Sequence, residues 1–138
     1  MEAASCWPIA RSFDEIMAYQ NDRVIDRYAK DYSQSIEYVH GCFDALKQFL
    51  IVCVLKPGYK VTSREIDGMW HTFILFTKNY REFCETYLGR FVNHNPFENP
   101  APGVYTETRN FTKFVFAELD EKYWPLDERA DCTSDCED

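Results

Sequence analysis

The apolar residues of this chain recur at helical spacing over most of its length. In residues 33–58, SQSIEYVHGCFDALKQFLIVCVLKPG, they follow the i, i+3, i+4, i+7 rule, and the second half is apolar nearly all round. This pattern predicts a central, buried helix that Pro57 and Gly58 end. Gly41 weakens the prediction at the middle of this helix, because glycine costs helix stability. The apolar positions are Ile36, Val39, Phe43, Leu46, Leu50, Cys53 and Val54.

Two further segments begin with the capping-box spacing of Ser or Thr followed by Glu three residues later. Ser12 and Glu15 open residues 12–31, while Thr62 and Glu65 open residues 62–76. The first segment has a partial apolar stripe and a charged opposite face, so it predicts a surface helix. The second carries the apolar stripe Ile66, Trp70, Phe73 and Ile74, which places Trp70 in the core.

The remaining helical signals lie on either side of a loop. Residues 78–89 predict a helix with Thr77 as its cap and Gly89 just past its end. Residues 93–103 are rich in Pro and Asn and predict a loop. Residues 108–125 predict a last helix, whose inward positions would be Phe111, Phe114, Val115, Leu119 and Trp124.

These signals predict a single compact all-α domain of about five helices. We expect an N-terminal arm over residues 1–11, a helical domain over 12–126 and an acidic, Cys-containing tail over 127–138. No internal repeat and no convincing alternating strand is visible; a hairpin signal at Val104–Tyr105 is weak.

Charge and composition narrow the classes of function. The chain has 138 residues, 46% hydrophobic and 17% aromatic, with a net charge of −8. That size suits one domain with a real core, and an acidic surface disfavours nucleic acid. No basic and apolar leader opens the chain, and the longest strongly apolar run, FLIVCVL at residues 49–55, is too short to span a bilayer. We therefore expect a cytoplasmic protein without a membrane or nucleic-acid partner.

The six cysteines are expected to be reduced, because no secretory signal is visible. Reduced cysteines serve as core residues, metal ligands or reactive groups. Whether Cys132 and Cys136 of the tail join a site is left open by their spacing.

Four residues near the middle of the chain are of metal-ligand type. His71 lies six residues before Thr77 and Cys84 seven after it, so two helices that fold back at Thr77 would bring them to similar heights. His94 follows in the loop, and Asp67 stands one turn before His71 as a fourth ligand, an orienting acceptor or a helix N-terminal charge. Zinc takes such nitrogen, sulfur and oxygen ligands.

Simpler interpretations stand beside this one. His71 next to Trp70 fits a core histidine, Cys84 fits a small apolar residue on a buried face, and His94 fits an ordinary loop residue. A Cys–His nucleophile pair would need an accessible thiol, whereas Cys84 falls on an apolar stripe. The chain has no GxSxG, P-loop, GxGxxG or HExxH motif.

The block REIDGMWHTFILFTKNYREFCETYLGRFVNHNP, residues 64–96, resembles the glycine-rich domain-containing protein-like family (the DUF1399 type), and most closely its short bacterial members. The resemblance extends over roughly residues 36–136. The chain departs from it at Phe73, where many relatives read WHTH, and at Asn93, where many have a second histidine. His71, Cys84 and His94 survive both departures, so the resemblance implies a shared polar site, either metal-bound or hydrogen-bonded, but no particular activity.

The leading hypothesis is a small cytosolic helical domain that binds a structural zinc through His71, Cys84, His94 and Asp67 and recognises a protein partner. The first alternative is a metal-free interaction protein with a buried Trp-His-Cys polar core. The second is an enzyme that depends on a thiol or a metal. An open coordination position would favour the enzyme, and a closed shell of four ligands would favour a structural metal.

Overall fold

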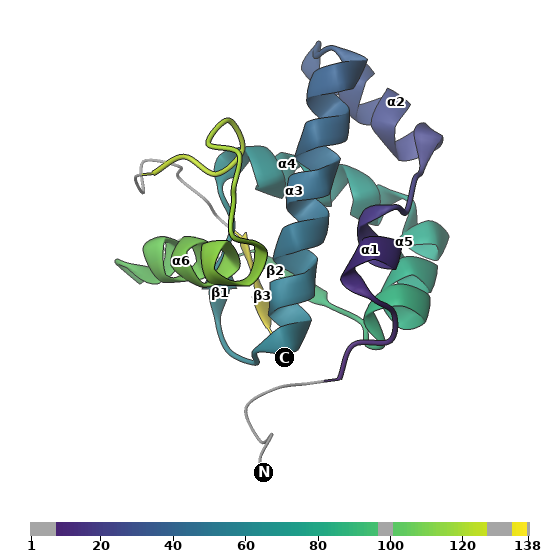
Figure 1. Ribbon diagram of the computed structural model, residues 1–138. Coiled ribbons are helices and arrows are strands. Elements are labelled where there is room, and N and C mark those ends of the chain that lie inside the picture. Colours follow the sequence, from purple (N-terminus) through teal and green to yellow (C-terminus); the bar gives the residue numbers. More distant parts are fainter. Residues whose placement is uncertain (1–7, 97–100, 127–133, 138) are drawn as a thin grey trace.

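The computed structural model describes residues 8–96, 101–126 and 134–137 (Figure 1). Within these ranges the elements are α1 (Phe13–Met17), α2 (Asp22–Tyr32), α3 (Ile36–Leu55), β1 (Lys60–Val61), α4 (Arg64–Leu75), α5 (Thr77–Phe83), a π-helical turn (Cys84–Leu88), β2 (Asn93–Pro96), α6 (Val104–Phe116) and β3 (Ser134–Glu137). The prediction of a mostly helical single domain is confirmed.

Helix α3 is the centre of the fold. In Figure 1 it runs through the middle of the molecule, with α1, α2 and α5 on one side and α6 on the other. It is long enough to cross a membrane, and an 18-residue stretch of it has a mean hydropathy of 1.4. However, 67% of that stretch is buried inside the domain. Its apolar side chains therefore serve the core, as the periodicity predicts.

The predicted surface helix over residues 12–31 is two helices, α1 and α2. The capping box of Ser12 and Glu15 is present, but the backbone breaks before Asn21, whose side chain caps α2. The buried Lys47 of α3 explains the break, because its ammonium donates to the carbonyl oxygens of Met17 at 2.6 Å and Tyr19 at 2.8 Å. A continuous helix would bond the Met17 carbonyl to an N–H four residues on.

Gly41 has a packing role in α3. A Cβ at this position would lie 2.9 Å from two ring carbons of Tyr123 and closer still to its hydroxyl. The Tyr123 hydroxyl donates to the Tyr38 carbonyl at 2.8 Å. The segment that follows α6 can therefore cross α3 only where α3 lacks a side chain.

A small antiparallel sheet in the order β1-β3-β2 joins three distant segments. Cys136 of β3 is the register partner of both Lys60 in β1 and His94 in β2. Strands of two to four residues are too short to show an alternating pattern, which explains why the sequence did not predict them. Of the tail, residues 134–137 form β3, while residues 127–133, including Cys132, lie outside the described part.

The described cysteines differ in state. Cys42 and Cys84 are buried free thiols, whereas Cys53 near the end of α3 is disulfide-bonded. The expectation that every cysteine is reduced therefore fails at Cys53.

The last predicted helix is displaced along the chain. Helix α6 begins four residues earlier than expected and ends at Phe116, before Ala117 turns the backbone to a positive φ of 72°. Phe114, predicted to face inward, is 84% exposed, whereas Trp124 is fully buried as predicted. Arg109 donates to the Trp124 carbonyl at 2.9 Å, which draws the segment after α6 back onto the helix.

Candidate metal site

Helix α4 supplies two of the candidate ligands. Its N-cap is Ser63 rather than the predicted Thr62, and the Ser63 hydroxyl both accepts from the Ile66 N–H and donates to the Tyr123 carbonyl. Asp67 and His71 are four residues apart, so they lie on one face of the helix. His71 Nε2 is 3.6 Å from Asp67 Oδ1. The imidazole side chain is 51% exposed, whereas the carboxylate side chain is 12% exposed.

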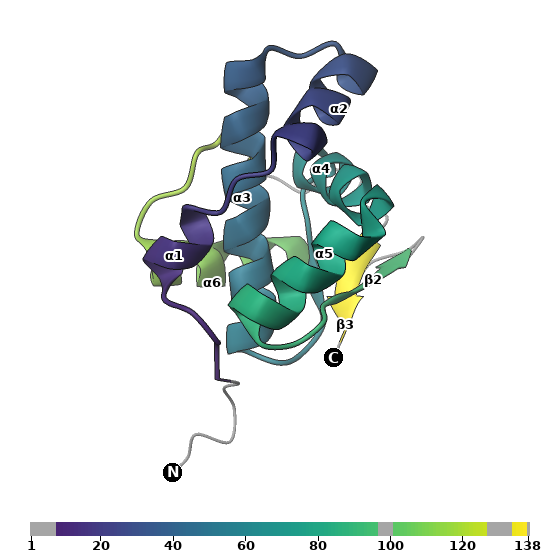
Figure 2. The same ribbon diagram turned by 90° about the vertical axis from the view of Figure 1, so that its right-hand side faces the viewer.

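The third ligand, His94, comes from strand β2. Its Nε2 lies 3.3 Å from Asp67 Oδ1, where the N–H can donate to the carboxylate. Its ring stands edge-on to Trp70, with centroids 4.3 Å apart, and 4.5 Å from the ring of His71. In Figure 2, β2 and β3 lie beside α5 and α4, so the sheet delivers His94 to the face of α4. The ligand atoms of Asp67, His71 and His94 all lie within 4.8 Å of one another.

Two buried hydrogen bonds in series hold β2 against α4. Trp70 Nε1 donates to the Tyr80 hydroxyl at 3.0 Å, which donates in turn to the Val92 carbonyl at 2.6 Å. Val92 precedes His94 by two residues, so these two hydrogen bonds fix the start of β2 relative to α4. Trp70 is fully buried, which confirms its predicted place in the core.

Cys84 lies outside this group of ligands. It is fully buried at the start of the π-helical turn. Burial raises the pKa of its thiol to about 11, although hydrogen bonds with the backbone of Val92 and the side chain of Tyr80 act to lower it. The thiol is therefore protonated at neutral pH and serves the packing between α5 and Val92. Within the described part of the chain, the structure brings together three of the four predicted ligands.

The spacing of the three groups suits a small divalent ion. Ligand atoms about 2.0–2.1 Å from a tetrahedral zinc lie about 3.3 Å from one another. The two distances from Asp67 Oδ1 are 3.3 and 3.6 Å, so small side-chain movements would place an ion between the groups. Asp67, His71 and His94 thus form a group that could hold a metal ion.

Tyr32 lies beside this group, and no motif or spacing in the sequence predicts its place there. A Cβ on Gly68, the neighbour of Asp67, would lie 3.2 Å from the Tyr32 hydroxyl. Burial, and next the charge of Asp67, raise the pKa of this phenol. The half-exposed phenol of Tyr32 therefore lies against Gly68, the residue that follows the candidate ligand Asp67.

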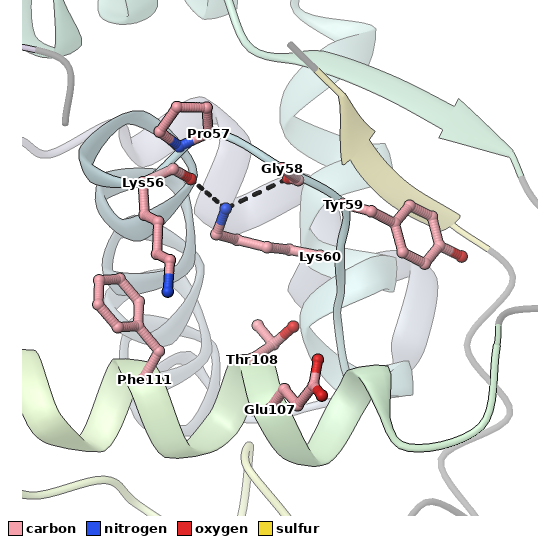
Figure 3. A pocket seen from close by; sticks show the side chains of 8 residues that line it. All are labelled: Lys56, Pro57, Gly58, Tyr59, Lys60, Glu107, Thr108 and Phe111. Atoms are coloured by element: carbon pink, nitrogen blue, oxygen red, sulfur yellow. Dashed lines mark hydrogen bonds between the residues drawn. The ribbon is translucent and has the colours of Figure 1, made fainter. Parts of the chain in front are cut away.

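A separate pocket of about 120 Å³ lies where the loop after α3 meets α6 (Figure 3). The Lys60 ammonium turns into it and donates to the carbonyl oxygens of Lys56 and Gly58, the latter at 3.2 Å. Lys56 itself stands over the ring of Phe111, 5.3 Å from its centroid. The Lys60 ammonium is thus bonded to the loop backbone, while the Val61 N–H of β1 donates to Thr108 Oγ1 of α6 at 3.2 Å.

Comparison with known protein families shows which family the chain matches. The sequence profile described as UCP032817-like matches residues 11–102, which contain all three ligands of the group. No curated protein and no solved structure matches the chain. The resemblance to the glycine-rich domain-containing protein-like family is corrected by this match.

Proposed function

We propose that this chain, which belongs to the UCP032817-like family, is a zinc-binding domain that holds its ion through Asp67, His71 and His94. The observation that carries the proposal is the convergence of three ligand atoms from α4 and β2 within 4.8 Å. Two imidazoles and a carboxylate are a donor set that zinc accepts in tetrahedral geometry.

Three protein ligands would leave a fourth position to a ligand from outside. The half-exposed side chain of His71 puts that position at the surface of the domain. A closed shell would have needed a further ligand, and Cys84 is turned into the core. We therefore propose that the zinc docks a protein partner, whose histidine or carboxylate side chain completes the coordination.

A zinc-dependent enzyme is the second candidate, and an open coordination position also fits it. The same open position would bind a water molecule, and zinc lowers the pKa of bound water enough to make it a nucleophile at neutral pH. The half-exposed phenol of Tyr32, next to Gly68, favours this candidate, because it could donate a hydrogen bond to an oxygen on the ion.

The test begins with tag-free protein purified without added metal, followed by elemental analysis and a zinc titration. We expect one zinc per chain. His71→Ala should weaken zinc binding at least about tenfold, or about 1.4 kcal/mol, while its exposed side chain makes the fold insensitive to the change. His40→Ala is the matched control, because His40 is the one histidine outside the group.

Zinc should also stabilise the fold in a pH-dependent way. At a free concentration one hundred times the Kd, a ligand that binds only the folded state adds about 2.7 kcal/mol to the free energy of unfolding. Protons compete with the ion for its ligands, so this gain should shrink at acid pH. Equal zinc affinity in His71→Ala and His40→Ala, or no binding to wild type, would reject the site and leave the metal-free hydrogen-bonded cluster.

A further inference from the structure

A second hollow, of about 330 Å³, lies where α2 passes the junction of α4 and α5. Its size is at the lower end of the range for small-molecule sites. It shares no residue with the metal group. Its lining residues are Arg23, Arg27, Leu75, Phe76, Thr77, Lys78 and Asn79.

The lining has an unusual charge for this protein. Three of its side chains are cationic and none is a carboxylate, although the whole chain has a net charge of −8. Arg27 is bonded to Asp31 at 2.7 Å, which offsets one charge. In the described ranges, no carboxylate is paired with Arg23 or Lys78. The hollow thus has an excess of about two positive charges.

The three cations are exposed, and two elements bring them to one hollow. Arg23 and Arg27 are four residues apart and so share one face of α2. The Arg23 guanidinium stands over the ring of Phe76, 5.1 Å from its centroid. Asn21 Nδ2 donates to Asn79 Oδ1 at 3.3 Å, which fixes the start of α2 against α5. Like charges gathered in this way repel one another unless an anion binds between them.

We infer that this hollow binds the phosphate group of a small phosphomonoester. A phosphate monoester carries a charge between −1.5 and −2 at neutral pH, which matches the excess of the lining, whereas a carboxylate carries only one charge. Guanidinium groups bind phosphate oxygens in a bidentate manner. The Thr77 hydroxyl and the side-chain amide of Asn79 add hydrogen-bond donors to the same wall.

The hollow lies close to the metal group, so the two sites must be tested apart. Leu75 of the lining is four residues beyond His71 on α4, which is about 6 Å along the helix axis. Phosphate could also bind a zinc ion directly. The binding experiment is therefore made on the full chain after EDTA treatment, so that its result does not depend on the metal site.

The experiment titrates phenyl phosphate into this protein at low ionic strength and follows binding by calorimetry and by NMR. We expect saturable binding of one molecule, which weakens as salt is added. The double variant Arg23→Gln/Lys78→Gln should bind at least tenfold more weakly. Lys113→Gln on α6, which lies away from α2 in Figure 1, removes a positive charge outside the hollow and should bind as wild type does.

Two further results decide the chemistry. Benzoate, which has the same ring and a single charge, should bind at least tenfold more weakly than phenyl phosphate. Equal affinity for both would overturn the assignment to a phosphate. The proposal also fails if wild type shows no saturation at millimolar phenyl phosphate, or if the double variant and Lys113→Gln bind it equally well. Circular dichroism of each variant confirms that it is folded.

Discussion

Gly41→Ala should destabilise the protein, although an exposed helix would gain from it. Alanine is favoured over glycine by about 1 kcal/mol inside a helix. Here the new Cβ would lie 2.9 Å from two ring carbons of Tyr123, a distance that real Cβ atoms essentially never show. Tyr123 is 3% exposed and cannot turn into solvent without leaving the Tyr38 carbonyl, which its hydroxyl bonds at 2.8 Å.

The neighbours of Tyr123 resist its movement. Its carbonyl accepts a hydrogen bond from the Ser63 hydroxyl at 2.6 Å, and the next residue, Trp124, is fully buried. Overpacking of this kind costs about 1–3 kcal/mol, and the lost hydrogen bond adds about 0.5–1.5 kcal/mol. After the helix-propensity gain of about 1 kcal/mol, the net loss should be about 0.5–3.5 kcal/mol.

Urea unfolding followed by tryptophan fluorescence measures this difference, provided that the m-value is unchanged. The matched test places Gly41→Ala in a Tyr123→Leu background, where the close contact is gone and the alanine should be neutral or stabilising. A Gly41→Ala protein as stable as wild type, or more stable, would refute the close packing of Tyr123 on α3.

Three other substitutions or treatments test the rest of the structure. Trp70→Ala should cost about 3–5 kcal/mol of unfolding free energy, since it empties a fully buried site and removes the donor to Tyr80; a stable variant that had lost only a partner would contradict this. Iodoacetamide at pH 8 should leave Cys42 and Cys84 unmodified in the folded protein, because burial raises their pKa values to about 12 and about 11. After unfolding without reductant, at most four of the six cysteines should react, because the disulfide at Cys53 occupies two; five or six reactive thiols would show that it is absent. Lys47→Met should lower stability by about 1–3 kcal/mol, because the carbonyls of Met17 and Tyr19 lose their donor. Burial lowers the pKa of the Lys47 ammonium, so the unfolded chain keeps this proton to a higher pH than the folded chain does. The difference in unfolding free energy between wild type and Lys47→Met should therefore widen as the pH rises toward about 10.4. A difference that narrows would contradict the burial of the charge.

Local signals in the sequence predicted local structure well. The capping box at Ser12 and Glu15 forms as expected, and Gly89 ends the helical segment at a φ of 93°. The break before Asn21 was not predictable, since it depends on Lys47, which reaches α1 from a different helix. The sheet was missed for the same kind of reason, because its strands are defined by partners distant in the chain.

The candidate site was predictable to the extent that it is local. Asp67 and His71 share a helix face through their spacing of four. The mirrored placement of His71 and Cys84 about the turn fixes only their heights along the two helices. It does not fix the direction of each side chain, and Cys84 points into the core at the start of a π-helical turn. Only the structure shows which way these side chains turn.

The position of β3 between β1 and β2 sets the order in which the site can assemble. Register partners Lys60 and Cys136 are separated by more than half of the chain, and closing so long a loop is slow compared with forming a helix. Asp67 and His71 are therefore in place as soon as α4 forms, whereas the strand that carries His94 is completed only when β3 pairs with it. Capture of an ion by all three ligands would be a late event in folding. In the reverse direction, local opening of the sheet would withdraw one candidate ligand while the helices stay folded, so that a bound ion could exchange without unfolding of the domain.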